Sequence, residues 1–245
     1  HSSYYAPSEL SVIDVPSGNQ LWTSSEVGHP LCFVGRELYA AQRSGSEFVF
    51  AFDARTGRVG REVALTPTAT PGCLAHNAAR NLLLGLPRVA DSPLWRMTGD
   101  DLIFSLQLNG AELKTIRTPS PGALRQVSQV RFSGDGTKAI VAHWKDSRVE
   151  VWDVRNWRIQ SLLDGHLGPI TDLAFSSDEM RVATASIDST VRVWDVQTGS
   201  SLATLHSADV DAFGYWMVTF GDNDLEVIAF SAKGIQRWNE LYVPK

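Results

Sequence analysis

Residues 190–196 read TVRVWDV and decide the fold, because the same pattern returns along the chain. Residues 148–154 read RVEVWDV and lie 42 positions earlier. Alternating apolar residues that end in an aspartate and a polar turn are typical of a β-strand. Self-similarity with a period of about 40 residues indicates a repeat architecture. Four looser copies occupy residues 10–15, 49–54, 102–108 and 235–239.

A second pattern precedes these strands. Residues 173–178 (LAFSSD) come before residues 182–186 (VATAS), and residues 130–136 (VRFSGDG) come before residues 139–142 (AIVA). Each pair is typical of two strands joined by a tight turn. Each repeat is therefore predicted to be an antiparallel meander of four strands, here named a to d in chain order.

The chain resembles the WD40-repeat family. A repeat of about 40 residues with Trp-Asp near the end of its third strand is the signature of that family. Residues 126–206 match it closely, whereas the rest matches in strand pattern and turn residues. The fifth repeat has Gly165-His166 and Trp194-Asp195 at the expected places. The resemblance implies an all-β fold, a β-propeller of four-stranded antiparallel blades.

The strands at the two ends of the chain leave the predicted ring incomplete. Residues 1–5 align with strand b of the first blade, and residues 218–238 supply strands a to c of the sixth. Because an open ring would expose unpaired sheet edges, we expect sequence upstream of His1 to complete six or seven blades. Residues 1–245 are accordingly interpreted as a single WD40-type β-propeller, the C-terminal part of a longer protein.

The net charge, the lengths of the apolar runs and the spacing of the cysteines limit the functions that the sequence predicts. A net charge of −5 makes nucleic acid an unexpected partner. No run approaches about 18 apolar residues and the start lacks a leader pattern, so we expect no membrane role and a cytoplasmic location. Cys32 and Cys73 have no second ligand at metal spacing, so no metal or other cofactor is expected.

One group of polar residues in the fifth repeat has two interpretations. His166, Ser186 and Asp188 could form a catalytic triad. The resemblance instead implies a buried structural chain of hydrogen bonds, because a buried tryptophan needs an acceptor for its indole N–H. Its members would be His166, Thr184 or Ser186, Asp188 and Trp194. We favour the structural interpretation and predict that the protein is not an enzyme.

The fourth repeat is expected to lack this chain. It keeps Asp146 and Trp152 at the matching positions. Ala142 and Trp144 stand where the fifth repeat has its two hydroxyl residues.

A long insertion interrupts the third repeat at residues 87–101, between strands b and c. Loops of this length are usually functional or disordered. Trp95 and Arg96 are residue types enriched at interface hot spots, although Trp95 could equally cover its own blade as a plug. Both interpretations stay open.

The resemblance implies a non-catalytic protein–protein interaction module, a scaffold or sensor domain of a larger multidomain protein of bacterial type. A protein or peptide would bind its top face, around the central channel. Three cations expected near one mouth favour an acidic partner. The residues expected to bind it are Trp95, Arg96, Arg125, Gln126, Ser128, Lys145, Pro169, Thr171 and Ile187.

The sequence is compatible with two other functions. Residues 11–15 followed by Ser17-Gly18 also resemble the repeats of lactonase-type propellers, so a propeller enzyme or small-ligand binder of lactonase-like type is the alternative. Such sites gather carboxylates and histidines around the axis, and matching positions of successive blades show no such set. A purely structural spacer is the third interpretation.

Overall fold

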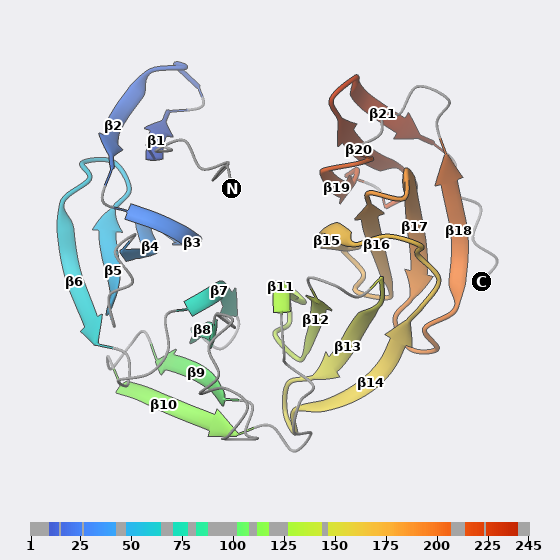
Figure 1. The fold of residues 1–245 in the computed structure, drawn as a ribbon, viewed down its shortest axis with the longest axis horizontal. Coiled ribbons are helices and arrows are strands. Elements are labelled where there is room, and N and C mark those ends of the chain that lie inside the picture. The colour runs from blue at the N-terminus through green and yellow to red at the C-terminus, as the bar shows by residue number, and fades with distance from the viewer. Residues whose placement is uncertain are drawn as a thin grey trace, which may run out of the picture. The chain divides into compact units, whose positions relative to one another are not determined.

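The computed structural model consists of β-strands joined by turns. It describes residues 10–14, 16–25, 27–42, 48–64, 71–77, 82–87, 102–107, 112–117, 127–143, 147–206, 214–222 and 224–239. No helix occurs within these ranges. The strands form six sheets, each built from strands consecutive in the chain (Figure 1).

The chain divides into two compact units, which are described separately. The first unit has one two-stranded and two four-stranded sheets. Its strands are β1 (Leu10–Ile13), β2 (Gln20–Ser24), β3 (Val27–Val34), β4 (Glu37–Gln42), β5 (Phe48–Asp53), β6 (Val59–Ala64), β7 (Pro71–Asn77), β8 (Leu82–Pro87), β9 (Leu102–Gln107) and β10 (Glu112–Arg117).

The second unit has two four-stranded sheets and one three-stranded sheet. Its strands are β11 (Val127–Phe132), β12 (Lys138–His143), β13 (Val149–Asp153), β14 (Arg158–Leu163), β15 (Ile170–Phe175), β16 (Arg181–Ser186), β17 (Thr190–Asp195), β18 (Ser201–His206), β19 (Met217–Phe220), β20 (Val227–Ser231) and β21 (Gly234–Trp238).

These sheets confirm the predicted fold class, all-β with four-stranded antiparallel blades. The sheets are numbered below as blades 1 to 6, so that β1 and β2 are strands c and d of blade 1. Strands β19 to β21 are strands a to c of blade 6, in the predicted phase. The expected strand b of blade 1 (residues 1–5) lies outside the described residues. The same holds for residues 88–101, which make up nearly all of the expected insertion in blade 3. The single domain, the blade number and closure by upstream sequence stay predictions.

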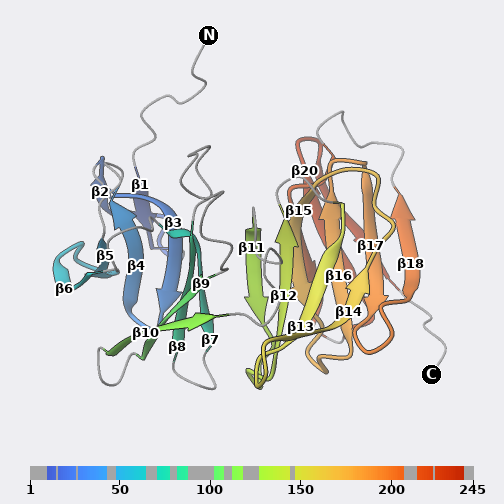
Figure 2. The same cartoon turned by 60° about the horizontal axis from the view of Figure 1, so that its bottom comes forward.

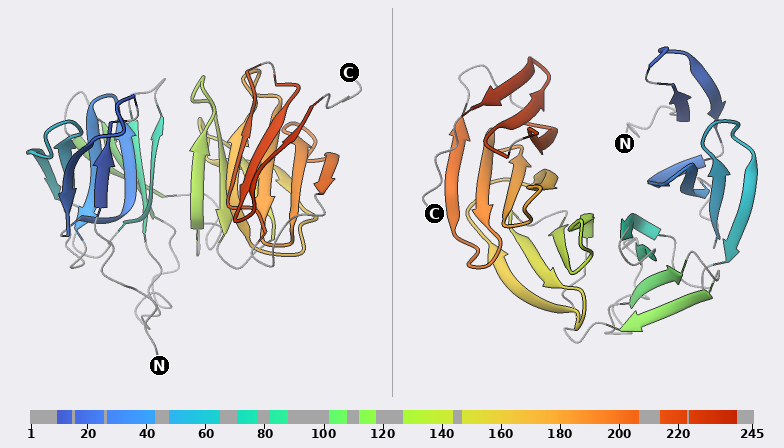
Figure 3. Two further views of the ribbon diagram at one scale, coloured as in Figure 1. Left: turned by 90° about the horizontal axis from the view of Figure 1, so that it is seen from above. Right: turned by 180° about the vertical axis from the view of Figure 1, so that it is seen from behind.

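The blades of the second unit pack face to face. Strands β12 and β16 are buried at almost every position, which explains their continuous apolar runs. One core cluster joins blades 4 and 5, with Ile140 and Val151 against Val182 and Trp194. Another joins blades 5 and 6. Figure 2 shows these blades standing side by side, and Figure 3 shows β14 and β18 on the outer side of this unit.

Each blade has two ends that carry different connections. In the second unit we call the end with the a–b and c–d turns the lower rim. The end with the b–c turns and the connections between blades is the upper rim. Consecutive first strands lie beside one another here, because β15 contacts both β11 and β19. Functional side chains on either rim are therefore positioned by loops on a rigid sheet framework.

Three c–d turns contain a glycine with positive φ, as their Ser-Gly and Thr-Gly sequences indicate, whereas the c–d turn of blade 4 has Trp157 at a φ of 54°. Gly18, Gly57 and Gly199 have φ values of 69°, 69° and 74°. The Gly199 amide donates to Asp195 O at 2.9 Å, which closes the turn. A Cβ on Gly199 would overlap the carbonyl oxygen of Leu162, whereas a Cβ on Gly18 would meet nothing within 4 Å. The c–d turn of blade 5 thus packs on strand d of blade 4.

We expect Gly199→Ala to destabilise the protein much more than Gly18→Ala. Both variants place an L-residue in the left-handed region, at a cost of about 1–2 kcal/mol. Only Gly199→Ala adds a clash with backbone, which should raise its cost to about 3 kcal/mol or more. Hydrogen exchange of the amides in the substituted blade measures both costs. Equal costs would contradict the packing of this turn.

Candidate functional site

The fifth blade contains one buried chain of side-chain hydrogen bonds. Trp194 Nε1 donates to Thr184 Oγ1 at 2.8 Å. Thr184 Oγ1 lies 2.7 Å from His166 Nε2, and His166 Nδ1 lies 2.8 Å from Asp188 Oδ2. The chain links strands c and b to the connection before strand a and to the b–c turn. Thr184, and not Ser186, is the hydroxyl residue in it.

The direction of the protons follows from the donors. Because the indole N–H only donates, Thr184 accepts from Trp194 and gives its own proton to His166 Nε2. His166 is then a neutral imidazole that donates from Nδ1 to the Asp188 carboxylate. Burial lowers the pKa of His166 and outweighs the raising effect of Asp188, which agrees with this neutral form.

Asp188 is the anchor of the upper rim in blade 5. It accepts the Leu167 amide at 2.9 Å, the Thr190 amide at 2.9 Å and the Thr190 hydroxyl at 2.7 Å. Burial acts to raise the pKa of Asp188, but these hydrogen bonds and His166 outweigh it and lower the pKa to about 2. The ionised carboxylate therefore fastens the loop before strand a to the b–c turn.

Ser186 has a different role from the one that a triad requires. Its hydroxyl lies 3.0 Å from each of the Gly168 and Pro169 carbonyl oxygens and accepts the Asp188 amide at 3.1 Å. Its described hydrogen bonds do not include His166. Ser186 is also fully buried, so the three residues do not form a nucleophile and base facing solvent.

The fourth blade satisfies its buried tryptophan in another way. Trp152 Nε1 donates to Glu150 Oε2 at 2.9 Å, and His143 Nε2 lies 3.3 Å from the same oxygen. Ala142 is buried and supplies no hydroxyl group, as expected. Asp146 and Trp144 lie outside the described residues. Sequence analysis missed Glu150, which occupies the position of Arg192 in blade 5, two residues before the tryptophan.

Several exposed apolar residues occur on the upper rim of blade 5 and at the start of blade 6. Leu167 is 92% exposed, Ile187 45% and Trp216 50%. Pro169 is also exposed, and its carbonyl oxygen accepts the Ile187 amide at 3.2 Å. We call these four residues the upper-rim cluster.

The segments that carry the upper-rim cluster are held together by close contacts of their backbones and of the Ile187 side chain. The Tyr215 amide donates to Ser186 O at 3.2 Å. A Cβ on Gly168 would lie 2.9 Å from Ile187 Cγ1, and a Cβ on Gly214 would lie 2.6 Å from Ile187 Cα. Both positions require glycine for this close approach. The cluster therefore rests on two loops packed directly against the b–c turn of blade 5.

The structure separates the residues expected to bind a partner into three groups. Pro169 and Ile187 are exposed on the upper rim. Thr171 and Ser128 are partly buried, and their hydroxyls donate to Tyr215 O and Ala142 O. Trp95, Arg96, Arg125, Gln126 and Lys145 lie outside the described residues.

Leu167 and Trp216 were missed by sequence analysis. The signal for Leu167 was an apolar residue directly after the Gly165-His166 pair, in an otherwise polar connection. Trp216 stands next to the first residue of β19, where an apolar residue predicts a strand rather than an exposed site.

The described residues contain no helix with the length and apolar character needed to cross a membrane. They also contain no group of three or more His, Cys, Asp and Glu side chains placed to hold a metal ion.

This arrangement of blades and hydrogen bonds defines a β-propeller protein. A solved structure of a computationally designed propeller, Ika8, has the same fold, with a TM-score of 0.65 and 21% identity over 98% of this chain and 68% of that chain. Residues 157–195 match the WD40 family, described as WD domain, G-beta repeat. The resemblance to WD40-repeat proteins is thereby confirmed, and the match includes His166, Thr184, Asp188 and Trp194.

Similar proteins carry WD repeats in larger chains. Eukaryotic translation initiation factor 3 subunit I of Caenorhabditis elegans is 33% identical over 95 residues, 38% of this chain and 29% of that protein. Small ribosomal subunit protein RACK1y of Oryza sativa subsp. japonica is 29% identical over 44% of this chain and 34% of its own length. WD repeat-containing protein 97 of Homo sapiens is 29% identical over 44% of this chain and 7% of its own length. The chain thus spans well under half the length of these relatives.

The replacement Thr184→Val should destabilise blade 5 by about 1–3 kcal/mol. Valine keeps the shape but leaves the Trp194 indole N–H and His166 Nε2 buried without partners. Urea unfolding measures the cost, with Thr198→Val on the exposed c–d turn as the control. Trp194→Ala should cost more, about 3–5 kcal/mol, because it opens a cavity. A Thr184→Val cost no larger than that of Thr198→Val would contradict the assigned chain.

Stability should fall in two steps as the pH is lowered. On unfolding, His166 regains its ordinary pKa of about 6.5 and takes up a proton, so stability declines below that pH. Asp188 titrates at about 2 when folded. Its pKa rises to about 3.9 on unfolding, so its contribution of about 2 kcal/mol is present above pH 4 and lost toward pH 2.

Urea unfolding of the natural protein and of Asp188→Asn across this range measures the second step. The variant should lose a smaller part of its stability in this range, because the pKa values of Asp53, Asp135 and Asp178 are also lowered and these groups keep their share of the decline. An equal decline below about pH 4 in both proteins would show that Asp188 does not cause it.

Proposed function

We propose that this protein is a non-catalytic interaction module whose upper rim binds a protein or peptide partner. The observation that supports it most is the upper-rim cluster. Exposed apolar residues on adjoining segments of one rim indicate an interaction site, and tryptophan is enriched among interface hot spots. The cluster rests on loops packed by glycines, so binding requires little ordering of the platform.

The relatives support the same class of function. One is a subunit of a translation initiation factor, and another is a protein of the small ribosomal subunit. Both names describe members of larger assemblies. By analogy we propose a scaffold role for this chain within a larger multidomain protein that acts in the cytoplasm.

The occupant of the upper-rim cluster is proposed to be a peptide or loop with an apolar anchor. Leu167, Ile187 and Trp216 offer apolar surface, and the chain of Trp194 to Asp188 beneath them holds the b–c turn in place. The preference for an acidic partner rests on Arg96, Arg125 and Lys145, so it stays a prediction that needs its own test.

The test measures the affinity of variants for a partner captured from the source organism with the full-length protein. Trp216→Ala and Leu167→Ala should each weaken binding about tenfold or more. Met180→Ala is the matched control, because Met180 is 53% exposed on the lower rim. Arg155→Glu, in the c–d turn of blade 4, is a second control. A loss confined to these controls would place the interface on the lower rim and overturn the proposal.

The acidic preference is tested separately. If Arg125→Glu and Trp95→Ala weaken binding as strongly as Trp216→Ala, the interface extends to both residues. Unchanged affinity in Arg125→Glu would remove the charge argument and leave the upper-rim cluster as the site.

A further inference from the structure

The a–b turns on the lower rim of the second unit share an unusual backbone conformation. The turns begin at Ser133, Ser176 and Gly221. The fourth residue of the turn is Gly136 in blade 4, Glu179 in blade 5 and Asp224 in blade 6, with φ values of 67°, 59° and 57°. Glycine is the residue that adopts this left-handed region without steric cost. Blades 5 and 6 nevertheless place an acidic residue there. A non-glycine residue persists in such a conformation when surrounding contacts compensate for the strain.

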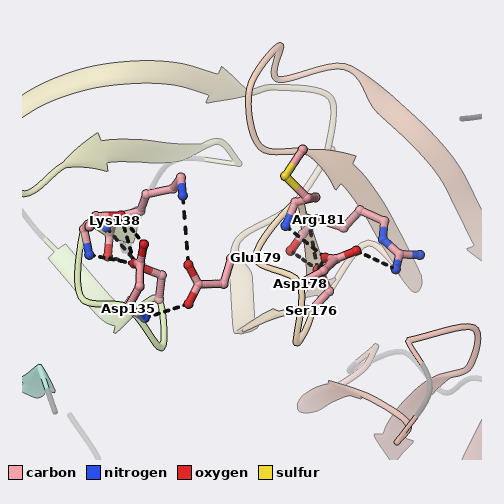
Figure 4. A network of polar contacts seen from close by, with 9 residues as sticks. Asp135, Lys138, Ser176, Asp178, Glu179 and Arg181 are labelled. Carbon is pink, nitrogen blue, oxygen red and sulfur yellow. Dashed lines mark hydrogen bonds and ion pairs between the residues drawn. The ribbon is translucent and has the colours of Figure 1, made fainter. Parts of the chain in front are cut away.

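The first of these contacts joins blade 5 to blade 4. Glu179 Oε1 accepts the backbone amide of Asp135 at 2.7 Å (Figure 4). Its other oxygen lies 4.0 Å from Lys138 Nζ, and the Glu179 side chain is only 17% exposed. Gly134 leaves room for the carboxylate, because a Cβ on it would lie 3.0 Å from Oε1. The acid therefore reaches out of its own turn into the turn of the preceding blade.

The second contact repeats this arrangement between blades 6 and 5. The two carboxylate oxygens of Asp224 each lie 2.9 Å from the Ser177 amide, and Oδ2 also accepts the Ser177 hydroxyl. The Asp224 carbonyl oxygen accepts Arg181 Nη1 at 3.0 Å. Asp224 is 6% exposed. Two successive blade junctions thus use an acid in the same turn position on the same kind of donor.

A different residue stabilises each turn internally. In blade 4 the Ser133 hydroxyl donates to Asp135 Oδ1 at 2.6 Å, and in blade 5 the Ser176 hydroxyl donates to Asp178 Oδ1 at 2.5 Å. These aspartates occupy the third position of the turn. The fourth residue closes its own turn through its backbone amide, since Glu179 N donates to Ser176 O and Asp224 N donates to Gly221 O, each at 3.0 Å. Its carboxylate is not needed for that closure and serves the junction between blades.

We propose that Glu179 and Asp224 are inter-blade latches. Each holds a strained left-handed conformation and uses its carboxylate to bind the backbone of the preceding a–b turn. Together they join the lower-rim turns of blades 4, 5 and 6 into one continuous series. Glycine, which normally stabilises a left-handed position, will for this reason weaken the structure at both sites.

The experiment compares glycine at a latch with glycine at a strained position that is not a latch. Ser189 has a φ of 66°. Its hydroxyl makes no hydrogen bond in the described part of the chain, so Ser189→Gly is the matched control. Ser189→Gly should raise the urea midpoint by relieving strain. Glu179→Gly should lower it, although the same strain is relieved.

Hydrogen exchange of single amides locates the effect. Glu179→Gly should speed exchange of the Asp135 amide by about tenfold or more and leave the Ser177 amide unchanged. Asp224→Gly should have the reverse pattern. Glu179→Gln, which keeps an acceptor oxygen in the same place, should retain part of the protection at Asp135 and gives a second readout if the glycine variant folds poorly.

Two results would overturn the proposal. One is a Glu179→Gly variant that gains stability as Ser189→Gly does. The other is unchanged exchange of the Asp135 amide in both Glu179 variants, which would show that the Glu179 carboxylate does not protect the turn of blade 4.

Discussion

The hydrogen bond from the Trp194 indole to Thr184 is the interaction on which the described site depends. The middle strands of blades 4 and 5 are buried on both faces, so any polar atom there needs an internal partner. The tryptophan fills the space between neighbouring blades, and its N–H starts a chain that ends at an ionised carboxylate near the rim. Core packing and loop position are thereby joined through Thr184 and His166.

Blade 4 also needs an acceptor for a buried indole N–H, but a different residue supplies it. Its tryptophan is equally buried, yet its indole N–H is satisfied by Glu150 from the same strand. In blade 5 the matching position holds Arg192, whose guanidinium lies 5.7 Å from the Trp194 ring centroid. In both blades the side chain two residues before the tryptophan therefore lies next to the indole, from strand positions that share one face.

Much of the fold could be predicted because its signal is periodic. The Trp-Asp strands set the phase of the meanders in blades 4 and 5, and alternating apolar residues followed by turn residues extend it to the looser copies. The choice between Thr184 and Ser186 was not accessible, since residues two apart on a strand face the same side and only their depth along the strand separates them. Glu150 was missed because alternation with valines favours an exposed position for a glutamate.

The latch acids were also beyond sequence reasoning. Glu179 and Asp224 stand at turn positions where acids are ordinary surface residues. Their importance comes from a φ angle and from a turn more than forty residues away. Contacts between repeats depend on how neighbouring sheets stack, and a single repeat does not encode that geometry.

The glycines beneath the upper-rim cluster have a consequence for how this surface can diverge. Gly214 brings one backbone against another, whereas Gly168 packs against both the Ile187 side chain and the Asp188 amide. The Ile187 side chain therefore belongs to the support, while Leu167 is 92% and Trp216 50% exposed. On the proposed function, exchange of Leu167 and Trp216 would change the choice of partner while the underlying loops keep their shape.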